Sequence, residues 1–264
     1  MGFVSANGLT LHTARSDNHH GETLVFVNSL GSDLRLWAPL LTDSGFAAYR
    51  WLLYDKRGHG LSDCPPPPYT IRDHVDDLDG LLQALNIAQA VVLIGISVGG
   101  MIAMDFASRQ PQRVKALVLL DTFPQIGTTE MWNERIRVLR EQGMGHLAPA
   151  ILSRWFAPSY PKEHPIDYAG YYNMLTRTPV EGYIGTCEAI RDADLTASAT
   201  RITCPTLIGC GSEDQATPPD LVSRLTDIIP GARYVEIVGA GHLPPIEAPQ
   251  ATAQAIQAFL KEVL

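Results

Sequence analysis

Runs of one kind of residue are largely missing from this chain of 264 residues, and their absence argues against several classes of protein. No block of Lys and Arg occurs and the formal net charge is -8, so we expect neither nucleic acid nor an anionic membrane surface as a partner. No stretch of about 18 apolar residues occurs, so we expect no transmembrane helix. Residues 1–15 lack a basic segment followed by an apolar run, so no signal peptide is expected.

Cysteine is also scarce, and its four copies form no recognisable motif. None belongs to a Cys-x-x-C pair, which argues against a metal or redox site of that kind; the four are Cys64, Cys187, Cys204 and Cys210. Scattered free thiols are typical of a reducing compartment, so we expect a cytoplasmic protein. We expect no metal and no organic cofactor, because no motif for either is present.

What the chain does contain is a series of short apolar runs separated by helical patterns. Most runs are apolar throughout, as is typical of strands buried on both faces of a parallel sheet; they are residues 24–27, 51–54, 91–94, 116–120, 206–208 and 234–238. Helical patterns occupy residues 71–85, 97–109, 218–229 and 248–264. An Asn7-Gly8 turn predicts a hairpin at the start. The fold class is therefore α/β, with a mostly parallel sheet of about eight strands and helices on both faces.

The alternation is interrupted once, after the strand that ends near Asp121. No strand-like run occurs before Pro205, and the interval is rich in aromatic residues. A structureless loop of this length would be unusual in a compact domain, so we predict an inserted helical lid. The predicted organisation is a core of residues 1–121 and 205–264 with a lid of residues 122–204.

A candidate nucleophile lies where one strand pattern meets a helix pattern. Gly95-Ile96-Ser97-Val98-Gly99 follows an apolar run and opens a helix. This G-x-S-x-G pattern, in strand–turn–helix context, is typical of a nucleophile elbow, in which glycines allow a tight turn that lifts the serine clear of the sheet. Ser97 is therefore the predicted catalytic nucleophile, with the helix N-terminus favouring a developing anion.

A serine hydroxyl needs a base, and the base needs an acid to orient it. His242 follows the last predicted strand, where a loop of small residues can return the imidazole over the elbow. Asp214 follows the penultimate strand and completes the chain order Ser, Asp, His. Glu213 and Asp121 are alternatives for the acid. His59, in a turn after an earlier strand, is interpreted as structural.

Two backbone N–H groups are expected to form an oxyanion hole. One comes from the residue after the nucleophile and the other from the loop after the strand at residues 24–27. These positions are Val98 and Leu30, the latter within Asn28-Ser29-Leu30-Gly31.

These motifs together resemble those of a known superfamily over nearly the whole chain. Residues 28–31, Tyr54-Asp55-Lys56-Arg57-Gly58-His59-Gly60-Leu61-Ser62 and residues 95–100 are similar to the α/β-hydrolases. Within that superfamily the lid segments resemble the 3-oxoadipate enol-lactonases of bacterial β-ketoadipate catabolism, above all residues 181–195. Ile96 and Val98 depart from the Leu and Met expected there, although Val98 still supplies its N–H.

The resemblance implies a serine hydrolase of aromatic-compound catabolism that opens a small anionic lactone through an acyl-enzyme. An anionic substrate of an acidic protein needs a local cation, and the planar fork of arginine suits a carboxylate. Arg135 is the candidate, with Arg154 as the alternative. Trp132 and Trp155 are expected to line the substrate site.

Other functions fit the same motifs. A generic carboxylesterase or a carbon–carbon bond hydrolase would share the triad and differ in the lid. A non-catalytic ligand receptor on the same fold is a more remote alternative. The sequence does not indicate an oligomeric state.

Overall fold

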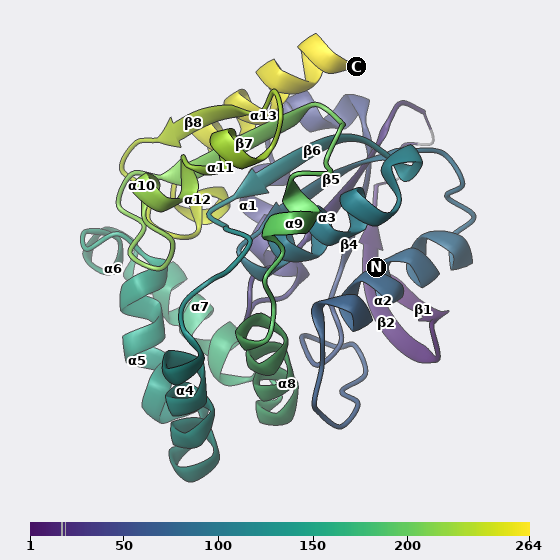
Figure 1. Ribbon diagram of the computed structural model, residues 1–264. Coiled ribbons are helices and arrows are strands. Elements are labelled where there is room, and N and C mark those ends of the chain that lie inside the picture. The colour runs from purple at the N-terminus through teal and green to yellow at the C-terminus, as the bar shows by residue number, and fades with distance from the viewer. Residues whose placement is uncertain (17, 19) are drawn as a thin grey trace.

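A single sheet organises the molecule. The computed structural model describes residues 1–16, 18 and 20–264, in which eight strands take the order β1-β2-β4-β3-β5-β6-β7-β8 (Figure 1). β2 pairs antiparallel with β1 and β4, and all other neighbours are parallel. The strands are Gly2–Ala6, Leu9–Arg15, Thr23–Val27, Arg50–Tyr54, Val91–Ile96, Val114–Leu120, Thr206–Gly211 and Arg233–Ile237, for β1 to β8 in turn. The predicted mostly parallel sheet, with a hairpin at its start, is confirmed.

Two groups of helices cover the sheet. α2 (Ile71–Ala84) packs against α3 (Val98–Arg109), which contacts β3, β5 and β6. α1 (Ala38–Leu41) packs against α13 (Pro249–Val263), which contacts β6 and β8 on the other side of the sheet (Figure 1). The short connecting helices are η1 (Leu34–Trp37), η2 (Ser44–Ala48), η3 (Pro111–Arg113) and α12 (Pro244–Glu247). With both faces covered, β3 and β5 are buried along their whole length.

The chain between β6 and β7 forms helices rather than strands. They are α4 (Thr129–Gln142), α5 (Met144–Trp155), α6 (Tyr160–Glu163), α7 (Pro165–Thr176), α8 (Val180–Arg191) and α9 (Thr196–Ala199). In Figure 1, α4, α5, α7 and α8 form a lobe below the sheet, whereas α9 returns to pack on α3. We call α4 to α8 the lid. α4 packs on α8 and α5 packs on α7, so the lid has its own helix–helix contacts.

One predicted helix is wrong in part. Residues 218–229 form two short helices, α10 (Pro219–Val222) and α11 (Leu225–Ile228), rather than one. At their junction the backbone N–H groups of Arg224 and of Thr226, at the start of α11, bond to carbonyls three residues back, the tighter 3₁₀ pattern. The hydroxyl of Thr226 also donates to the Ser223 carbonyl oxygen, a local bond that competes with a regular helix.

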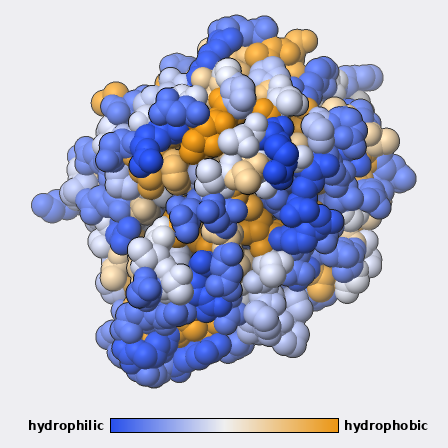
Figure 2. Space-filling view, viewed as in Figure 1, coloured by the Kyte–Doolittle hydropathy of each residue, from blue (hydrophilic) through white to orange (hydrophobic). Residues whose placement is uncertain are grey.

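The surface differs from the core in composition. On the face shown in Figure 2, apolar residues are scattered among hydrophilic ones. Within the described residues, no helix has the length and apolar character needed to cross a membrane.

Candidate active site

Ser97 occupies the sharp turn that joins β5 to α3. Its backbone has φ of 57° and ψ of -123°, a strained conformation for a residue with a side chain. A Cβ at Gly95 would lie 2.3 Å from the Gly99 carbonyl oxygen, and one at Gly99 would lie 2.0 Å from that of Val27. Only glycine fits these two positions. The local sequence therefore forms the tight turn that the G-x-S-x-G pattern predicts.

His242 and Asp214 meet at the ends of the last two strands. The Nδ1 atom of His242 lies 2.8 Å from Oδ2 of Asp214, and both side chains are buried. Oδ2 also accepts a hydrogen bond from the Thr217 hydroxyl at 2.7 Å, and Oδ1 accepts one from the Ala216 N–H at 2.7 Å. Burial raises the pKa of Asp214, but His242 and these donors outweigh it, so its pKa is below the ordinary value. The carboxylate is ionised and fixes the orientation of the ring.

The structure distinguishes the three acids that the sequence left open. Glu213 is exposed, whereas Asp121 is buried beside Asp214. Oδ1 of Asp121 accepts a hydrogen bond from the Gly211 N–H, and Oδ2 has no partner. Burial and the negative charge of Asp214 raise the pKa of Asp121 well above its ordinary value, so it is a neutral acid. Only Asp214 of the three contacts His242.

The two N–H groups predicted for an oxyanion hole are free donors. In the described part of the chain, neither Leu30 N–H nor Val98 N–H has a hydrogen-bond partner. The loop that contains Leu30 is supported by His59, whose Nε2 accepts from the Gly31 N–H at 3.0 Å. Burial lowers the pKa of His59 well below its ordinary value, so the ring is neutral. This position agrees with a structural role for His59.

A pocket brings the predicted residues together. Ser97, His242 and Leu30, which come from the sheet and its loops, form what we call the sheet wall. Trp132 and Trp155, which come from lid helices, belong to the lid wall. The space not filled by atoms, open mouth included, is about 610 Å³. Trp132 is anchored by a hydrogen bond from its indole to the Ile126 carbonyl oxygen. The carbonyl oxygen of Trp155 accepts a hydrogen bond from the backbone N–H of His242 at 2.9 Å, so the lid contacts the loop that carries His242 directly.

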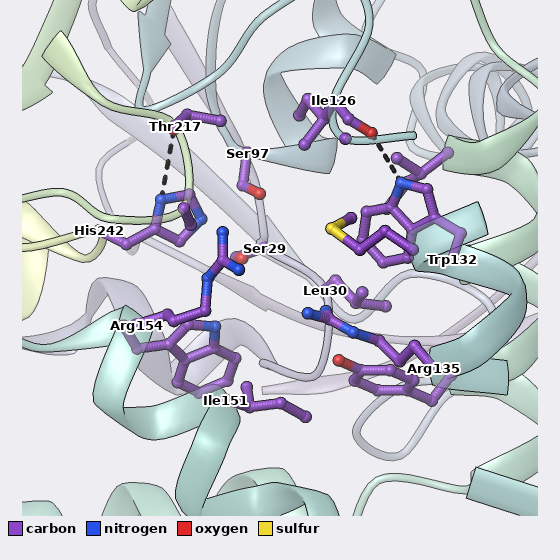
Figure 3. Close-up of a pocket in the computed structure, with 16 residues that line it drawn as sticks. Ser29, Leu30, Ser97, Ile126, Trp132, Arg135, Ile151, Arg154, Thr217 and His242 are labelled. Carbon is purple, nitrogen blue, oxygen red and sulfur yellow. Dashed lines mark hydrogen bonds between the residues drawn. The ribbon is translucent and has the colours of Figure 1, made fainter. Parts of the chain in front are cut away.

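Two lid arginines point into this pocket. Arg135 on α4 stacks over the Trp132 ring at 4.8 Å, and Arg154 on α5 donates to the Gln215 carbonyl oxygen at 3.0 Å (Figure 3). Among the described residues, no carboxylate forms an ion pair with either. Three other lid arginines, Arg137, Arg140 and Arg191, are paired with acids. Burial and the positive charge of Arg135 lower the pKa of Arg154. The pocket therefore concentrates uncompensated positive charge.

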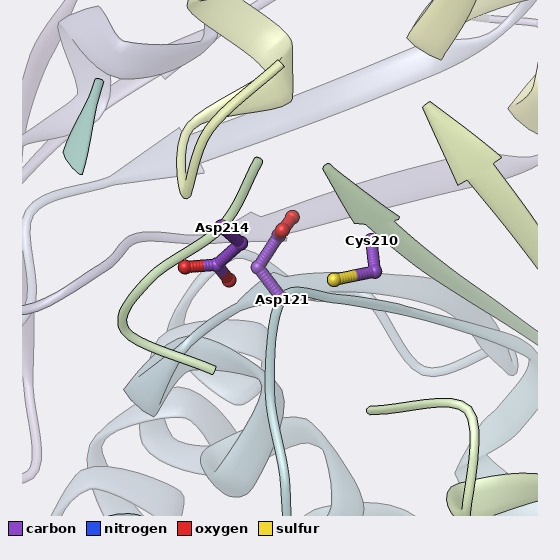
Figure 4. A group of neighbouring side chains, drawn as sticks. All are labelled: Asp121, Cys210 and Asp214. Carbon is purple, nitrogen blue, oxygen red and sulfur yellow. The ribbon is translucent and has the colours of Figure 1, made fainter. Parts of the chain in front are cut away.

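A second cluster of polar groups lies behind the histidine. One ligand atom each of Asp121, Cys210 and Asp214 lies within 4.8 Å of the others (Figure 4). Burial raises the pKa of the Cys210 thiol, as it does that of Asp121, so neither is ionised. The oxygens of Asp214 are occupied by His242 and its other donors. Metal ions bind deprotonated thiols and carboxylates, so this cluster does not suit a metal.

Three contributors to the site were not anticipated. Thr217 supports Asp214, Tyr183 lines the pocket, and Ser29 lies beside Leu30 at its floor. Thr217 stands three residues after Asp214, a spacing at which a hydroxyl can bond back to an acid. Tyr183 lies within residues 181–195, which carry the resemblance, but no pattern predicted that it reaches the pocket, which it does from α8.

The comparisons with known proteins agree on one family. Residues 24–255 match the sequence model of the alpha/beta hydrolase family. The chain is 31% identical to 3-oxoadipate enol-lactonase 2 of Acinetobacter baylyi, over 98% of this chain and 96% of that protein. An enol-lactonase structure from Burkholderia xenovorans LB400 has 37% identity and a TM-score of 0.94, covering 98% of this chain and all of the other. A malate-bound esterase from Thermogutta terrifontis has 28% identity and a TM-score of 0.92, covering 99% and 98%.

Proposed function

Since the chain belongs to the alpha/beta hydrolase family and is a hydrolase, we propose that it opens 3-oxoadipate enol-lactone to 3-oxoadipate in aromatic-compound catabolism. The observation that carries the proposal is the pair Arg135 and Arg154, which line the same pocket as Ser97 without carboxylate partners among the described residues. A guanidinium group binds a carboxylate through two parallel hydrogen bonds, so a small substrate that carries a carboxylate complements this charge. The resemblance to enol-lactonases names such a substrate.

The chemistry begins with the serine. His242 accepts the hydroxyl proton as Ser97 Oγ attacks the ring carbonyl, and ionised Asp214 stabilises the imidazolium that forms. The carbonyl oxygen becomes an anion and accepts hydrogen bonds from the Leu30 and Val98 N–H groups. The free state of these donors supports this assignment, because neither must break another bond to receive the anion.

The leaving group makes the reaction favourable. Collapse of the intermediate breaks the ring C–O bond, and protonated His242 gives its proton to the leaving oxygen, which produces an enol that remains tethered to the acyl-enzyme. The enol tautomerises to a ketone, which removes the nucleophile that could close the ring again. Water, deprotonated by His242, then attacks the ester of Ser97, and His242 returns the proton to Ser97 Oγ as the product is released.

The lid wall holds the substrate in this scheme. The Trp132 ring lies flat against the lactone, Trp155 lines the same wall of the pocket, and Arg135 binds the carboxylate. Arg154 is the alternative partner for that group. Its guanidinium is already anchored to a backbone carbonyl, whereas that of Arg135 stacks on the Trp132 ring, and this difference favours Arg135.

A spectrophotometric assay on the enol-lactone tests the proposal. We expect multiple turnovers of the lactone with a kcat/KM well above that for neutral p-nitrophenyl acetate. A preference for the neutral ester would instead support a generic carboxylesterase. Ser97→Ala, assayed in parallel, identifies turnover that does not depend on this site.

A further inference from the structure

The peptide unit that presents the Leu30 N–H is held from behind by three donors. Its carbonyl oxygen, that of Ser29, accepts hydrogen bonds from Lys56 Nζ at 2.6 Å and from the Ser32 hydroxyl at 2.9 Å. The Ser32 backbone N–H is a third donor at 3.3 Å. In a trans peptide the C=O and N–H point in opposite directions, so these donors lie on the side away from the free N–H. Hydrogen bonds to a carbonyl polarise the whole peptide and strengthen its N–H as a donor.

Lys56 is an unusual residue to find at this point. Its side chain is buried, with only 1% of the residue exposed, and its ammonium bonds to backbone carbonyl oxygens. No carboxylate of the described residues lies within ion-pair distance of it. A buried charge of this kind is costly, and lysine is rarely buried without a paired acid. The field of the ammonium therefore acts mainly on the Ser29–Leu30 peptide.

The peptide of the second candidate donor, the Val98 N–H, also has three donors bonded to its carbonyl oxygen, but none of them is charged. The Ser97 carbonyl oxygen, which shares its peptide with the Val98 N–H, accepts from the Thr122 hydroxyl at 2.7 Å. It also accepts from the Gly100 and Met101 N–H groups, at 2.9 and 3.2 Å. Each peptide thus has three donors behind it, but only the Leu30 peptide has a charged one.

We propose that Lys56 is a positioning residue that acts through the Ser29–Leu30 peptide, strengthening the Leu30 N–H toward the oxyanion of the transition state. The inference rests on the proposed function, because it needs the oxyanion to form at this N–H. Lys56 does not touch the substrate. Its effect is therefore on kcat and not on substrate affinity.

The charge of Lys56 makes this effect depend on pH. Burial lowers the pKa of Lys56 to about 7, although the nearby carboxylates of Asp55 and Asp33 oppose the shift. The other titratable groups around it, His59 and His74, are neutral because burial and the charge of Lys56 lower their pKa values. As the pH rises through about 7, the ammonium loses its charge and the Leu30 donor weakens. We therefore expect kcat to fall on the alkaline side.

The same shift gives an opposite expectation for stability. The folded-state pKa lies below the ordinary value of 10.5, so the charged form opposes folding. That cost is fully present below pH 7 and is relieved as the pH rises from about 7 to about 10.5. Lys56→Met keeps the length of the side chain and removes the charge. Its Tm at pH 6 should therefore equal or exceed that of the wild type.

The test compares Lys56→Met with Thr122→Val, which removes the neutral donor behind the other peptide. Turnover of p-nitrophenyl acetate is followed from pH 6 to pH 9 at the isosbestic wavelength of the released phenol. At pH 6 we expect kcat of Lys56→Met to be about tenfold lower with KM within about twofold, less than the roughly 10²–10³-fold lost with an oxyanion donor itself. The alkaline fall should disappear in Lys56→Met and persist in Thr122→Val.

Lys56→Gln provides a second neutral variant that can still donate to the Ser29 carbonyl, and it too should lose the alkaline fall. An alkaline fall that persists in either Lys56 variant, or a wild-type kcat that does not fall between pH 6 and 9, would overturn the inference. If Ser97→Ala is inactive while Lys56→Met matches the wild type, this inference alone fails. Retained turnover in Ser97→Ala would overturn the proposed function as well.

Discussion

The two walls of the pocket are built on different principles. On the sheet wall Ser97 and His242 are buried, and His242 is fixed by a hydrogen bond of 2.8 Å to the buried Asp214. On the lid wall Arg135 and Arg154 have no carboxylate partners among the described residues, whereas Arg137 and Arg140, on the same helix as Arg135, are paired with acids. Groups that are fixed within the protein suit a chemical step common to many substrates. Charged groups without a partner in the protein favour a substrate that carries the opposite charge.

The largest effect should come from the sheet wall. Ser97→Ala removes the attacking oxygen, so we expect kcat on the enol-lactone to fall by at least about 10⁴-fold. The positive φ at this position strains the backbone of alanine about as much as that of serine, because both residues have a Cβ atom, so Tm should change little. Initial rates and thermal unfolding check both expectations. If the variant stays folded and keeps a tenth of the activity, the sheet wall does not supply the nucleophile.

Two neighbouring aspartates on the sheet wall should respond very differently. Asp214→Asn removes the charge that stabilises the imidazolium, and kcat should fall by roughly 10³–10⁴-fold. Asp121→Asn replaces a neutral acid by an amide of the same shape and should keep activity within about threefold. The two kcat values, measured at pH 7.5, decide between them. An Asp121→Asn loss equal to that of Asp214→Asn would mean that both carboxyls act as one acid.

On the lid wall we expect an effect that depends on the substrate. Arg135→Met should lower kcat/KM for the anionic lactone by about 10- to 100-fold, the value of one charge-assisted hydrogen bond. Turnover of neutral p-nitrophenyl acetate should change by less than about threefold, because that ester has no carboxylate to hold. Arg154→Met, measured in the same way, shows whether the second arginine shares the carboxylate.

Arg137 gives the matched control for the lid wall. It lies on α4 with Arg135 but is exposed and paired with Glu134 and Glu141. Arg137→Met should leave kcat/KM for both substrates within about twofold. Equal losses on the lactone and the neutral ester in Arg135→Met would show that the lid arginine supports the fold of the pocket rather than selecting an anion.

On the sheet wall, the position of the nucleophile could be predicted from the sequence more fully than the identity of the acid that orients His242. Gly95, Ser97 and Gly99 lie within five consecutive residues, so a local turn pattern suffices to locate the elbow. The acid is different, because three carboxyls end the right strands and only the three-dimensional contact with His242 distinguishes Asp214.

Buried charges were the hardest to foresee. Lys56 stands between an acid and an arginine in a loop, where lysine is usually exposed, and only packing reveals that it turns inward to Ser29. The lid arginines were anticipated from the charge of the expected substrate, a chemical argument rather than a pattern. Their lack of acid partners among the described residues required the structure.

The smallest expected effect concerns Glu247, which joins the two walls. Its carboxylate accepts hydrogen bonds from the Ala157 N–H, beyond the end of α5, and from the Gly241 N–H beside His242. Burial raises the pKa of Glu247 to about 7, against the bonds from these N–H groups. Because the folded-state pKa lies above the ordinary value of 4.5, the protonated form stabilises the fold. That contribution is complete below about pH 4.5 and is lost as the pH rises through 7.

Glu247→Gln should remove this dependence, since the amide does not titrate. The free energy of unfolding of the variant minus that of the wild type should be larger at pH 7.5 than at pH 5, by on the order of 2 kcal/mol. Urea unfolding at the two pH values measures the difference, and Glu262→Gln, at an exposed glutamate, is the control. A Glu247→Gln difference that is the same at both pH values would mean that the carboxylate at this junction is already ionised. An ionised Glu247 would then bond both the lid, at Ala157, and the loop that carries His242, at Gly241. The two walls would in that case share a charged group, and the lid wall would not differ from the sheet wall in every respect.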